Sequence, residues 1–288
     1  MFDNSRWARM SATRSIMIGD IRVSYVPDGL VQMHPRWLGG AAAQDFAAGT
    51  DCLDGEGYLA GSVGGLLVEN GDRRMLIDAG FGGNRVPAHL MPDGLGQIEG
   101  GRLVEGLREL GVAPGGIEVV AFTHLHDDHI GWAVRGPADR EVFAGAQFFA
   151  GEAEWRWWSG AVDPRRAQVL GRRMNPAADG REVFPGVTAW STPGHTPGHT
   201  SYVVESGGQR LIAFGDVLHS PIQFADPRWG SANDFDRTQA VASRQAVIAE
   251  LSDEKVTGFG GHFADVVFGS LPDNTGTRLR WQPVDATD

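Results

Sequence analysis

Alternating hydrophobic and polar positions along the chain predict short strands separated by turns. Residues 16–27 alternate in the manner of a half-buried strand. Residues 64–69 and 74–78 are two further strand-like runs, and the Asn-Gly-Asp sequence at 70–72 between them is typical of a hairpin. Residues 29–50 are rich in Gly and Ala, so we expect a long irregular segment there.

Helical spacing follows the first strands. Leu103, Leu107 and Leu110 would share one helix face, and Gly111 and Pro114 would end that helix. Further strands are expected over residues 117–122, 147–149, 187–190, 201–205, 210–214 and 256–259, and further helices from about residue 152 and over 240–251. Hairpins followed by a helix occur once in each half, which predicts a single domain with two related halves over residues 16–288, preceded by a mobile arm over 1–15.

Composition narrows the class of protein. With 42% hydrophobic and 21% charged residues among 288, the chain is typical of a globular domain. The net charge is −11 and Lys255 is the single lysine, which argues against nucleic acid as a partner. Cys52 is the single cysteine, so a disulfide framework is excluded. No apolar run of about 18 residues occurs, so we expect no membrane association and a cytoplasmic location.

Residues with metal-ligand chemistry stand at the ends of the expected strands. They are His124, His126, Asp128, His129, His199, Asp216 and His262. In a sandwich of sheets such ends can converge on one edge, where His124 and His126 would aim at one point and Asp128 and His129 at a neighbouring one. Imidazole and carboxylate without thiolate suit zinc and similar divalent ions, and favour a catalytic site over a structural one.

Other catalytic signatures are missing from the sequence. No serine lies in a G-x-S-x-G elbow, no G-x-G-x-x-G follows a strand, and Lys255 is in no phosphate-binding loop. Asp127 is interpreted as a solvated or capping side chain. The Glu-Trp-Arg-Trp-Trp sequence at 154–158 is interpreted as a helix face that packs on the sheet, with one tryptophan reaching a pocket wall as the alternative.

The ligand-rich segment resembles a known family. The pattern H-x-H-x-D-H at 124–129 lies between Thr123 and Gly131, and G-H-T-P-G-H at 194–199 follows it, with Gly-Asp at 215–216 and Gly-His at 261–262. Over roughly residues 55–270 the chain is similar to the metallo-β-lactamase superfold of metal-dependent hydrolases. The resemblance implies an α/β fold, a four-layer αββα sandwich of two mixed β-sheets flanked by helices.

The resemblance also implies a role for each matching residue. One metal would be held by His124, His126 and His199, a second by Asp128, His129 and His262, and Asp216 would bridge the two. Asp78 would orient a ligand by a hydrogen bond. His195 is expected to be a turn residue or to support a ligand from behind. The cofactor would be two divalent ions, most typically zinc, although manganese, cobalt or iron fit the same donors.

The segment at 215–223 looks most like a subgroup of lactonases and methyl-parathion-type hydrolases. The resemblance implies that a metal-bridging hydroxide attacks the carbonyl of a lactone or related ester, with Asp128 and Asp216 positioning the nucleophile. His219 stands where the homoserine lactonases have a tyrosine. It would polarise the carbonyl, protonate the leaving alkoxide, or only pack.

Several alternatives remain at this point. They are a thioesterase or glyoxalase-II-like hydrolase, an organophosphate hydrolase, a mononuclear iron oxygenase that uses His124, His126, His199 and Asp216, and a non-catalytic scaffold. The expected partner is a small molecule with an apolar or acyl part. The reason is that residues 29–50, with Met33, Trp37 and Phe46, could form an apolar lid over the metals. Core packing is the other interpretation of these side chains. The oligomeric state is open between a monomer and a homodimer.

Overall fold

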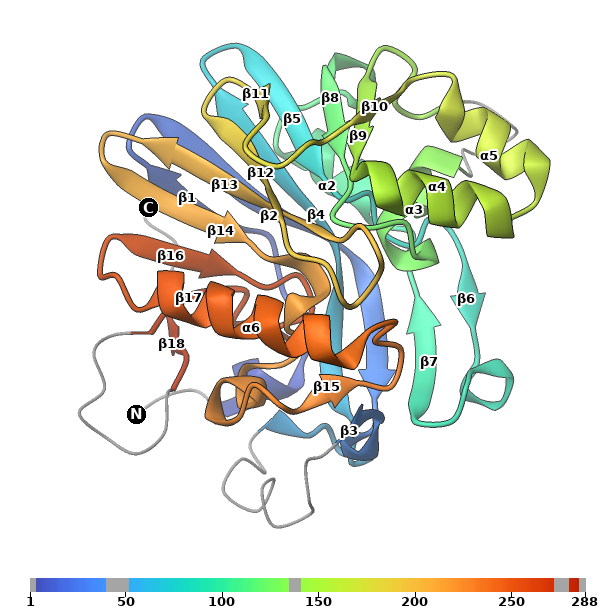
Figure 1. The fold of residues 1–288 in the computed structure, drawn as a ribbon, viewed down its shortest axis with the longest axis vertical. Coiled ribbons are helices and arrows are strands. Elements are labelled where there is room, and N and C mark those ends of the chain that lie inside the picture. Colours follow the sequence, from blue (N-terminus) through green and yellow to red (C-terminus); the bar gives the residue numbers. More distant parts are fainter. Residues whose placement is uncertain (1–3, 40–51, 135–140, 272–279, 285–288) are drawn as a thin grey trace.

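Two β-sheets form the centre of the molecule (Figure 1). The computed structural model describes residues 4–39, 52–134, 141–271 and 280–284. The first sheet has nine strands, in the order β10-β9-β8-β5-β4-β2-β7-β6 with β1 paired to β2. Their bounds are β1 (Arg14–Ile18), β2 (Ile21–Met33), β4 (Leu59–Asn70), β5 (Arg73–Ile77), β6 (Arg85–Val86), β7 (Leu95–Glu99), β8 (Val119–Ala121), β9 (Gln147–Ala150) and β10 (Met174–Pro176).

The second sheet comes from the second half of the chain and has seven strands in the order β11-β12-β13-β14-β16-β17-β18. Their bounds are β11 (Glu182–Phe184), β12 (Val187–Ser191), β13 (Thr200–Ser206), β14 (Gln209–Ala213), β16 (Val256–Phe259), β17 (Phe268–Ser270) and β18 (Gln282–Pro283). A small pair, β3 (Leu38–Gly39) and β15 (Gly230–Ser231), links the halves. The strands of the first sheet therefore lie within residues 14–176 and those of the second within residues 182–283, and the single domain with two related halves stays a prediction.

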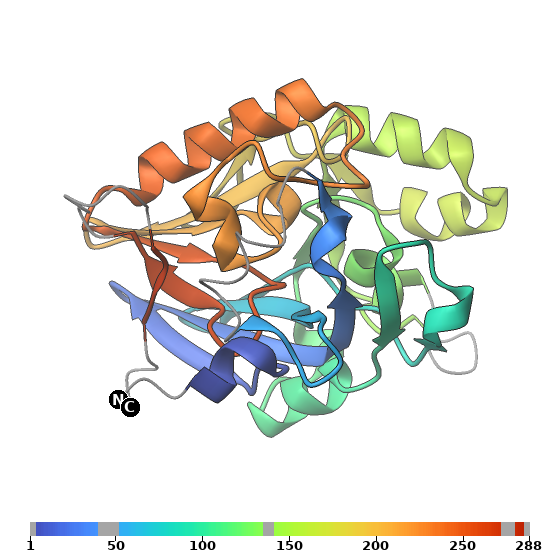
Figure 2. The same ribbon diagram turned by 90° about the horizontal axis from the view of Figure 1, so that it is seen from below.

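Helices cover the outer faces of both sheets. Their bounds are α2 (Leu103–Glu109), α3 (Asp127–Val134), α4 (Glu152–Ala161), α5 (Pro164–Gly171) and α6 (Arg237–Leu251). Helices α2 to α5 pack on the first sheet through a cluster that includes Leu107 and Trp158, and α6 packs on the second through Val247. A third apolar cluster fills the space between the sheets. Figure 2 shows α6 along one outer side. The predicted four-layer αββα arrangement is confirmed.

Residues 4–14, part of the segment predicted as a mobile arm over 1–15, pack against the loop between β16 and β17. Residues 4–8 form the 3-10 helix η1 (Asn4–Ala8). The carboxylate of Asp265, only 1% exposed, forms ion pairs with Arg9 and Arg14 at 2.8 and 2.7 Å, and Arg6 donates to its backbone oxygen at 2.9 Å. A buried carboxylate needs such partners, and this pairing orders residues 4–14.

The expected irregular segment at 29–50 begins five residues too early, because residues 29–33 belong to β2. Strand β2 continues through a bulge at Pro27 and Gly29 to Met33. Asp28, at the bulge, accepts backbone hydrogen bonds from Phe81 and Gly82 at 2.8 and 3.0 Å. The Pro-Asp-Gly sequence therefore connects the bulge to the loop after β5, and the strand does not end there. Of the predicted lid residues, Met33 and Trp37 are buried, and Phe46 lies outside the described residues.

The direction of the strands gathers the loops that follow them. Strands β5 and β8 run parallel in the first sheet, and β14 and β16 run parallel in the second. The carboxyl ends of parallel strands lie at the same edge of a sheet, so the loops after these four strands meet between the sheets. In the part of the chain that the structure describes, no helix has the length and apolar character needed to cross a membrane.

Candidate metal centre

The loop after β8 carries the densest group of polar side chains. It leaves the strand at Phe122 and turns directly into α3, whose first turn contains Asp127 and Asp128. The partial positive charge at a helix N-terminus favours carboxylates there. The N–H of His129 donates to the carbonyl of His126 at 3.0 Å, which closes the turn and directs the side chains of this segment to one side.

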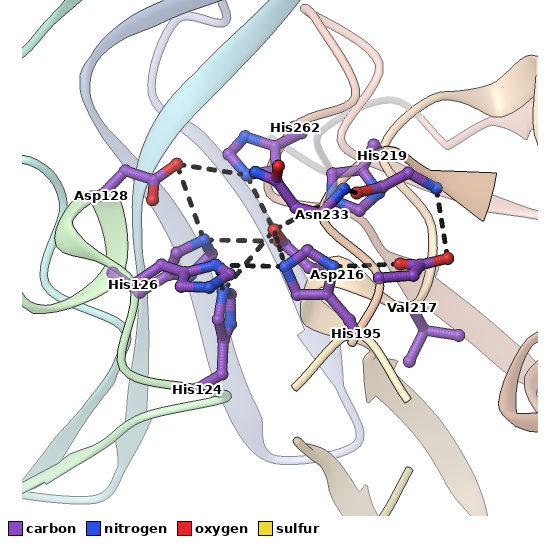
Figure 3. A network of polar contacts seen from close by, with 12 residues as sticks. His124, His126, Asp128, His195, Asp216, Val217, His219, Asn233 and His262 are labelled. Atoms are coloured by element: carbon purple, nitrogen blue, oxygen red, sulfur yellow. Dashed lines mark hydrogen bonds and ion pairs between the residues drawn. The ribbon is translucent and has the colours of Figure 1, made fainter. Parts of the chain in front are cut away.

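Three histidines form a first group (Figure 3). Nδ1 of His126 lies 2.9 Å from Nε2 of His124 and 3.2 Å from Nε2 of His195. The same Nε2 atoms of His124 and His195 lie 3.6 and 3.3 Å from Oδ2 of Asp216. These four ligand atoms are all within 4.8 Å of one another, which is the spacing of donors around one ion.

A second group lies on the other side of the same carboxylate. Nε2 of His129 and Nε2 of His262 are each 3.3 Å from Oδ1 of Asp216. Oδ2 of Asp128 lies 3.8 and 3.7 Å from these two nitrogens. Asp216 therefore turns one oxygen toward each group, which is the arrangement of a carboxylate that bridges two cations.

Local backbone geometry places Asp216 between the groups. Asp216 follows β14 in the short 3-10 helix η7 (Gly215–Val217). Gly215 has φ +51°, and a Cβ there would come within 2.7 Å of both His199 and Thr123. Glycine is required because this residue combines a left-handed conformation with close approach to two neighbouring loops.

The rear nitrogens of three of these rings have oxygen partners. Nδ1 of His129 is 2.9 Å from Oδ2 of Asp78, and Nδ1 of His262 is 2.8 Å from the carbonyl oxygen of Ser62. Nδ1 of His195 is 3.2 Å from Oδ1 of Asp234. Carboxylate and carbonyl oxygens only accept, so each Nδ1 donates, and Nε2 is the nitrogen that each ring turns toward its group.

The structure exchanges the expected places of His195 and His199. Both nitrogens of His199 are used within the fold: Nδ1 lies 3.0 Å from Oγ1 of Thr192, and Nε2 accepts the N–H of Asp216 at 3.0 Å. His199 is therefore not part of the first group, and His195 stands beside His124 and His126 in its place. This geometry differs from the expected one, with His199 in the first group and His195 behind it; which of the two binds a metal stays a prediction.

Burial and charge set the protonation of these side chains. Burial lowers the pKa of His124 well below its usual value and that of His126 to about 3. Burial also lowers the pKa of His129 and His262, but nearby carboxylates, Asp216 first among them, raise it above the ordinary value. Burial raises the pKa of Asp216, yet the charges of His262 and His129 hold it well below its usual range. The site thus combines an ionised bridge with neutral imidazoles at His124 and His126.

Several buried polar atoms here have no hydrogen-bond partner among the described residues. They include Nε2 of His129, Oδ1 of Asp216 and Nε2 of His219. Leaving buried polar atoms unpaired costs roughly 1–3 kcal/mol each, so a cluster of them is expected only where a ligand completes it. Nitrogen and oxygen donors without thiolate are those of a catalytic zinc site, so the residues present fit two divalent cations.

His219 borders both groups. Its Nε2 is 3.0 Å from Oδ2 of Asp216, and its ring stacks on that of His262 at 5.8 Å between centroids. Trp37 meets the same ring edge-on at 4.9 Å. Burial lowers the pKa of His219, so the ring is neutral at pH 7 and can donate one N–H.

Two buried carboxylates of the site were missed by the sequence analysis. Asp234 supports His195, as above. Glu154, on α4, accepts the N–H of Leu125 at 3.0 Å and that of Gly198 at 3.2 Å, which ties the two histidine loops together. Glu154 was assigned to a helix face, and Trp157 of that face does reach the site, 6.4 Å between centroids from His126.

Comparison of sequences finds relatives among metal-dependent hydrolases. Residues 63–136 match the model described as the metallo-beta-lactamase superfamily. An N-acyl homoserine lactonase of Bacillus sp is 26% identical over 212 residues, which span 68% of this chain and 79% of the relative. Metallo-beta-lactamase domain-containing protein 1 of Xenopus laevis is 26% identical over 216 residues, which span 75% of this chain and 82% of the relative.

Comparison of structures agrees. AidC, described as a dizinc quorum-quenching lactonase in complex with a product, superposes with a TM-score of 0.80 at 20% identity, over 97% of this chain and 99% of its own. Hydrolase AbOPH, described as a member of the beta lactamase superfamily, superposes with a TM-score of 0.76 at 23% identity, over 97% of this chain and 100% of its own. At these identities the likeness confirms the predicted fold.

Proposed function

We propose that this chain, which carries a metallo-β-lactamase superfamily domain, is a metal-dependent hydrolase. It would use two divalent cations, most suitably zinc, to open a lactone or related ester. The observation that carries the proposal is the division of the Asp216 carboxylate, one oxygen toward each ligand group. The ligand set we assign is His124, His126, His195 and Asp216 for the first ion, and Asp128, His129, His262 and Asp216 for the second.

When bound, such a pair of ions supplies an activated water as nucleophile and polarises the carbonyl oxygen. Asp128 is the side chain placed to move the proton. It is 20% exposed, more than the 6% of Asp216, and is therefore the more accessible of the two carboxylates. Burial raises its pKa, but the charges of His129 and His262 lower it below the usual value. An ionised Asp128 can accept the proton of the attacking water and pass it to the alkoxide as the ester C–O bond breaks.

His219 is assigned to the substrate oxygens. This neutral imidazole, whose Nε2 lies 3.0 Å from Oδ2 of Asp216, can donate its N–H to the carbonyl oxygen as negative charge develops there. The edge-on contact with Trp37 and the stacking on His262 fix the ring. His219 would therefore do what the lactonase tyrosine does in the relatives that the sequence resembles.

The surroundings of the metal centre favour a substrate with an apolar or acyl part. The hollow beside His219 and His262, which Trp7, Met33 and Val266 help to line, has room for little more than one water molecule. An accessible apolar surface is offered instead by exposed Phe235, which meets Trp157 at 6.0 Å between ring centroids, next to His126. Such surfaces lower the free energy of an apolar group removed from water by about 25 cal/mol per Å².

The test is metal analysis of the purified protein, followed by hydrolysis of an N-acyl homoserine lactone, a simple lactone and an aryl ester with and without chelator. We expect two equivalents of metal and cleavage that stops on chelation and returns with zinc. Asp128→Asn should lose the activity, whereas Asp127→Asn, on an exposed neighbour that pairs with Arg166, should keep it. One equivalent of iron without hydrolysis would contradict the proposal and favour an oxygenase.

A further inference from the structure

Behind the first ligand group lies a buried ion pair that the site chemistry above does not use. Asp234 stands in the loop between β15 and α6, and Arg244 stands on α6. Their side chains are 0% and 1% exposed, and Nη2 of Arg244 lies 3.1 Å from Oδ2 of Asp234. A fully buried pair is costly to desolvate, so its place directly behind a ligand calls for an explanation.

The two oxygens of Asp234 face different partners. Oδ1 faces Nδ1 of His195 at 3.2 Å. Oδ2 accepts from both terminal nitrogens of Arg244, at 3.2 and 3.1 Å, and from the N–H of Ser231 at 3.2 Å. Since Arg244 and the Ser231 N–H are donors only, they keep Asp234 ionised and fix which oxygen points at His195.

Arg244 is itself held on all sides. Its Nε donates to the carbonyl of Pro227 at 2.7 Å, and Nη1 lies 3.4 Å from the carbonyl of Val217, the residue after Asp216. Two backbone hydrogen bonds, from Phe235 to the carbonyl of His195 at 3.1 Å and from Asp236 to that of Gly194 at 2.9 Å, hold the Asp234 loop against the His195 turn. The pair is therefore rigidly connected to both the bridging carboxylate and the first ligand group.

We propose that Asp234, oriented by Arg244, is a positioning residue that holds His195 with its proton on Nδ1 and its Nε2 lone pair toward the first cation. The inference rests on the proposed function for the role of His195. His199 is not available for this ligand place, because its Nε2 already accepts the N–H of Asp216.

The Asp234→Asn variant separates this role from simple filling of space. Asn has nearly the same volume but one acceptor oxygen, and Arg244 and Ser231 would draw that oxygen to their side. The amide NH₂ would then face Nδ1 of His195 and move the ring proton to Nε2, where it blocks a metal ligand. The matched control is Asp236→Asn, two residues along the same loop, where the side chain caps α6 and Asn can still accept those bonds.

Zinc titration of the chelator-treated proteins against a competing dye is the first readout. We expect Asp234→Asn to bind one of its two equivalents about 10- to 100-fold more weakly, the usual effect of losing a partner behind a ligand, while Asp236→Asn keeps both. Wild-type affinity for both equivalents in Asp234→Asn would overturn the proposal. A wild-type protein that binds no zinc would instead contradict the proposed function.

A second readout needs no variant to fold. Long-range ¹H–¹⁵N spectra of the wild-type protein, recorded metal-free and zinc-loaded, report the tautomer of each histidine ring. The proposal requires the proton of His195 on Nδ1 in both samples. A His195 ring protonated at Nε2 in the metal-free protein would overturn it, whatever the metal content proves to be.

Discussion

At the scale of single residues, local sequence cannot distinguish the two Gly-His repeats at 194–199. Both histidines follow a glycine in the same turn-rich segment, and the choice between them depends on tertiary contacts. His199 meets Thr192 and the backbone of Asp216, whereas His195 meets Asp234, 39 residues along the chain. Ligands packed within six residues, as at 124–129, could be recognised from spacing alone.

Substitution of the two histidines tests this assignment. His195→Ala should lose one equivalent of metal. His199→Gln should retain both, because Gln can still accept the N–H of Asp216, but should lose about 1–3 kcal/mol of unfolding free energy as one buried hydrogen bond fails. Metal analysis and urea unfolding of both variants check this. Loss of one metal equivalent in His199→Gln, with two retained in His195→Ala, would restore the assignment made from sequence.

The role of His219 is separable from its packing. His219→Phe keeps a ring against Trp37 and His262 but removes the donor. We expect kcat to fall about 100-fold or more, the usual contribution of a positioned proton donor, with a smaller change in KM. Steady-state kinetics on the best lactone or ester substrate measure both constants. A kcat within twofold of wild type would mean that His219 only packs.

At the scale of elements, the pattern of apolar residues predicted the strands and helices that carry the site. The expected hairpin of β4 and β5, the buried strand β8 and the long helix α6 are all found, because each has a strong local signal. The extension of β2 beyond Pro27 was not predicted, since Pro-Asp-Gly is a turn sequence and its bulge is held by hydrogen bonds that Asp28 accepts from Phe81 and Gly82. Bulges of this kind depend on partners distant in sequence.

The loop before α6 makes a specific prediction about substrate binding. Phe235 is 62% exposed and meets Trp157, which lies beside His126, so an apolar group of a bound substrate would cover its ring. Phe235→Ala should raise KM about three- to tenfold for substrates with an apolar chain, from the lost burial of part of a phenyl ring, and leave kcat nearly unchanged.

The control for this variant is Leu90→Ala. Leu90 is 67% exposed and lies in the short 3-10 helix η4 (Ala88–Leu90), between β6 and β7. The KM of Leu90→Ala should match that of wild type for a series of substrates with different acyl chain lengths. An equal KM for Phe235→Ala at every chain length would exclude Phe235 from the substrate surface.

At the scale of the whole molecule, the N-terminal segment and the loop after His262 stabilise one another through Asp265. Burial raises the pKa of this carboxyl, but hydrogen bonds from Arg14 and Arg9 lower it below its usual value. A carboxyl with a depressed pKa stabilises the fold above its unfolded pKa of about 3.9. That contribution is lost as pH falls through the lower folded value.

Asp265→Asn should therefore lower the unfolding free energy by about 3 kcal/mol at pH 7, the usual cost of removing one member of a buried pair. The difference from wild type should shrink as pH falls below about 4, because the wild-type carboxyl then binds a proton on unfolding. Guanidinium unfolding of metal-free wild type and Asp265→Asn between pH 7 and pH 3 measures this difference in unfolding free energy. A difference that is constant across this range would show that the arginines do not act through the charge of Asp265.

The central claim, that Asp216 bridges two cations within one set of seven ligands, is tested most directly by anomalous diffraction at the zinc edge from crystals of the zinc-loaded protein. We expect two peaks roughly 3.5–4 Å apart, one on each side of the Asp216 carboxylate, with His195 on the first and His262 on the second. A single peak, or a first peak bound by His199 in place of His195, would contradict the account.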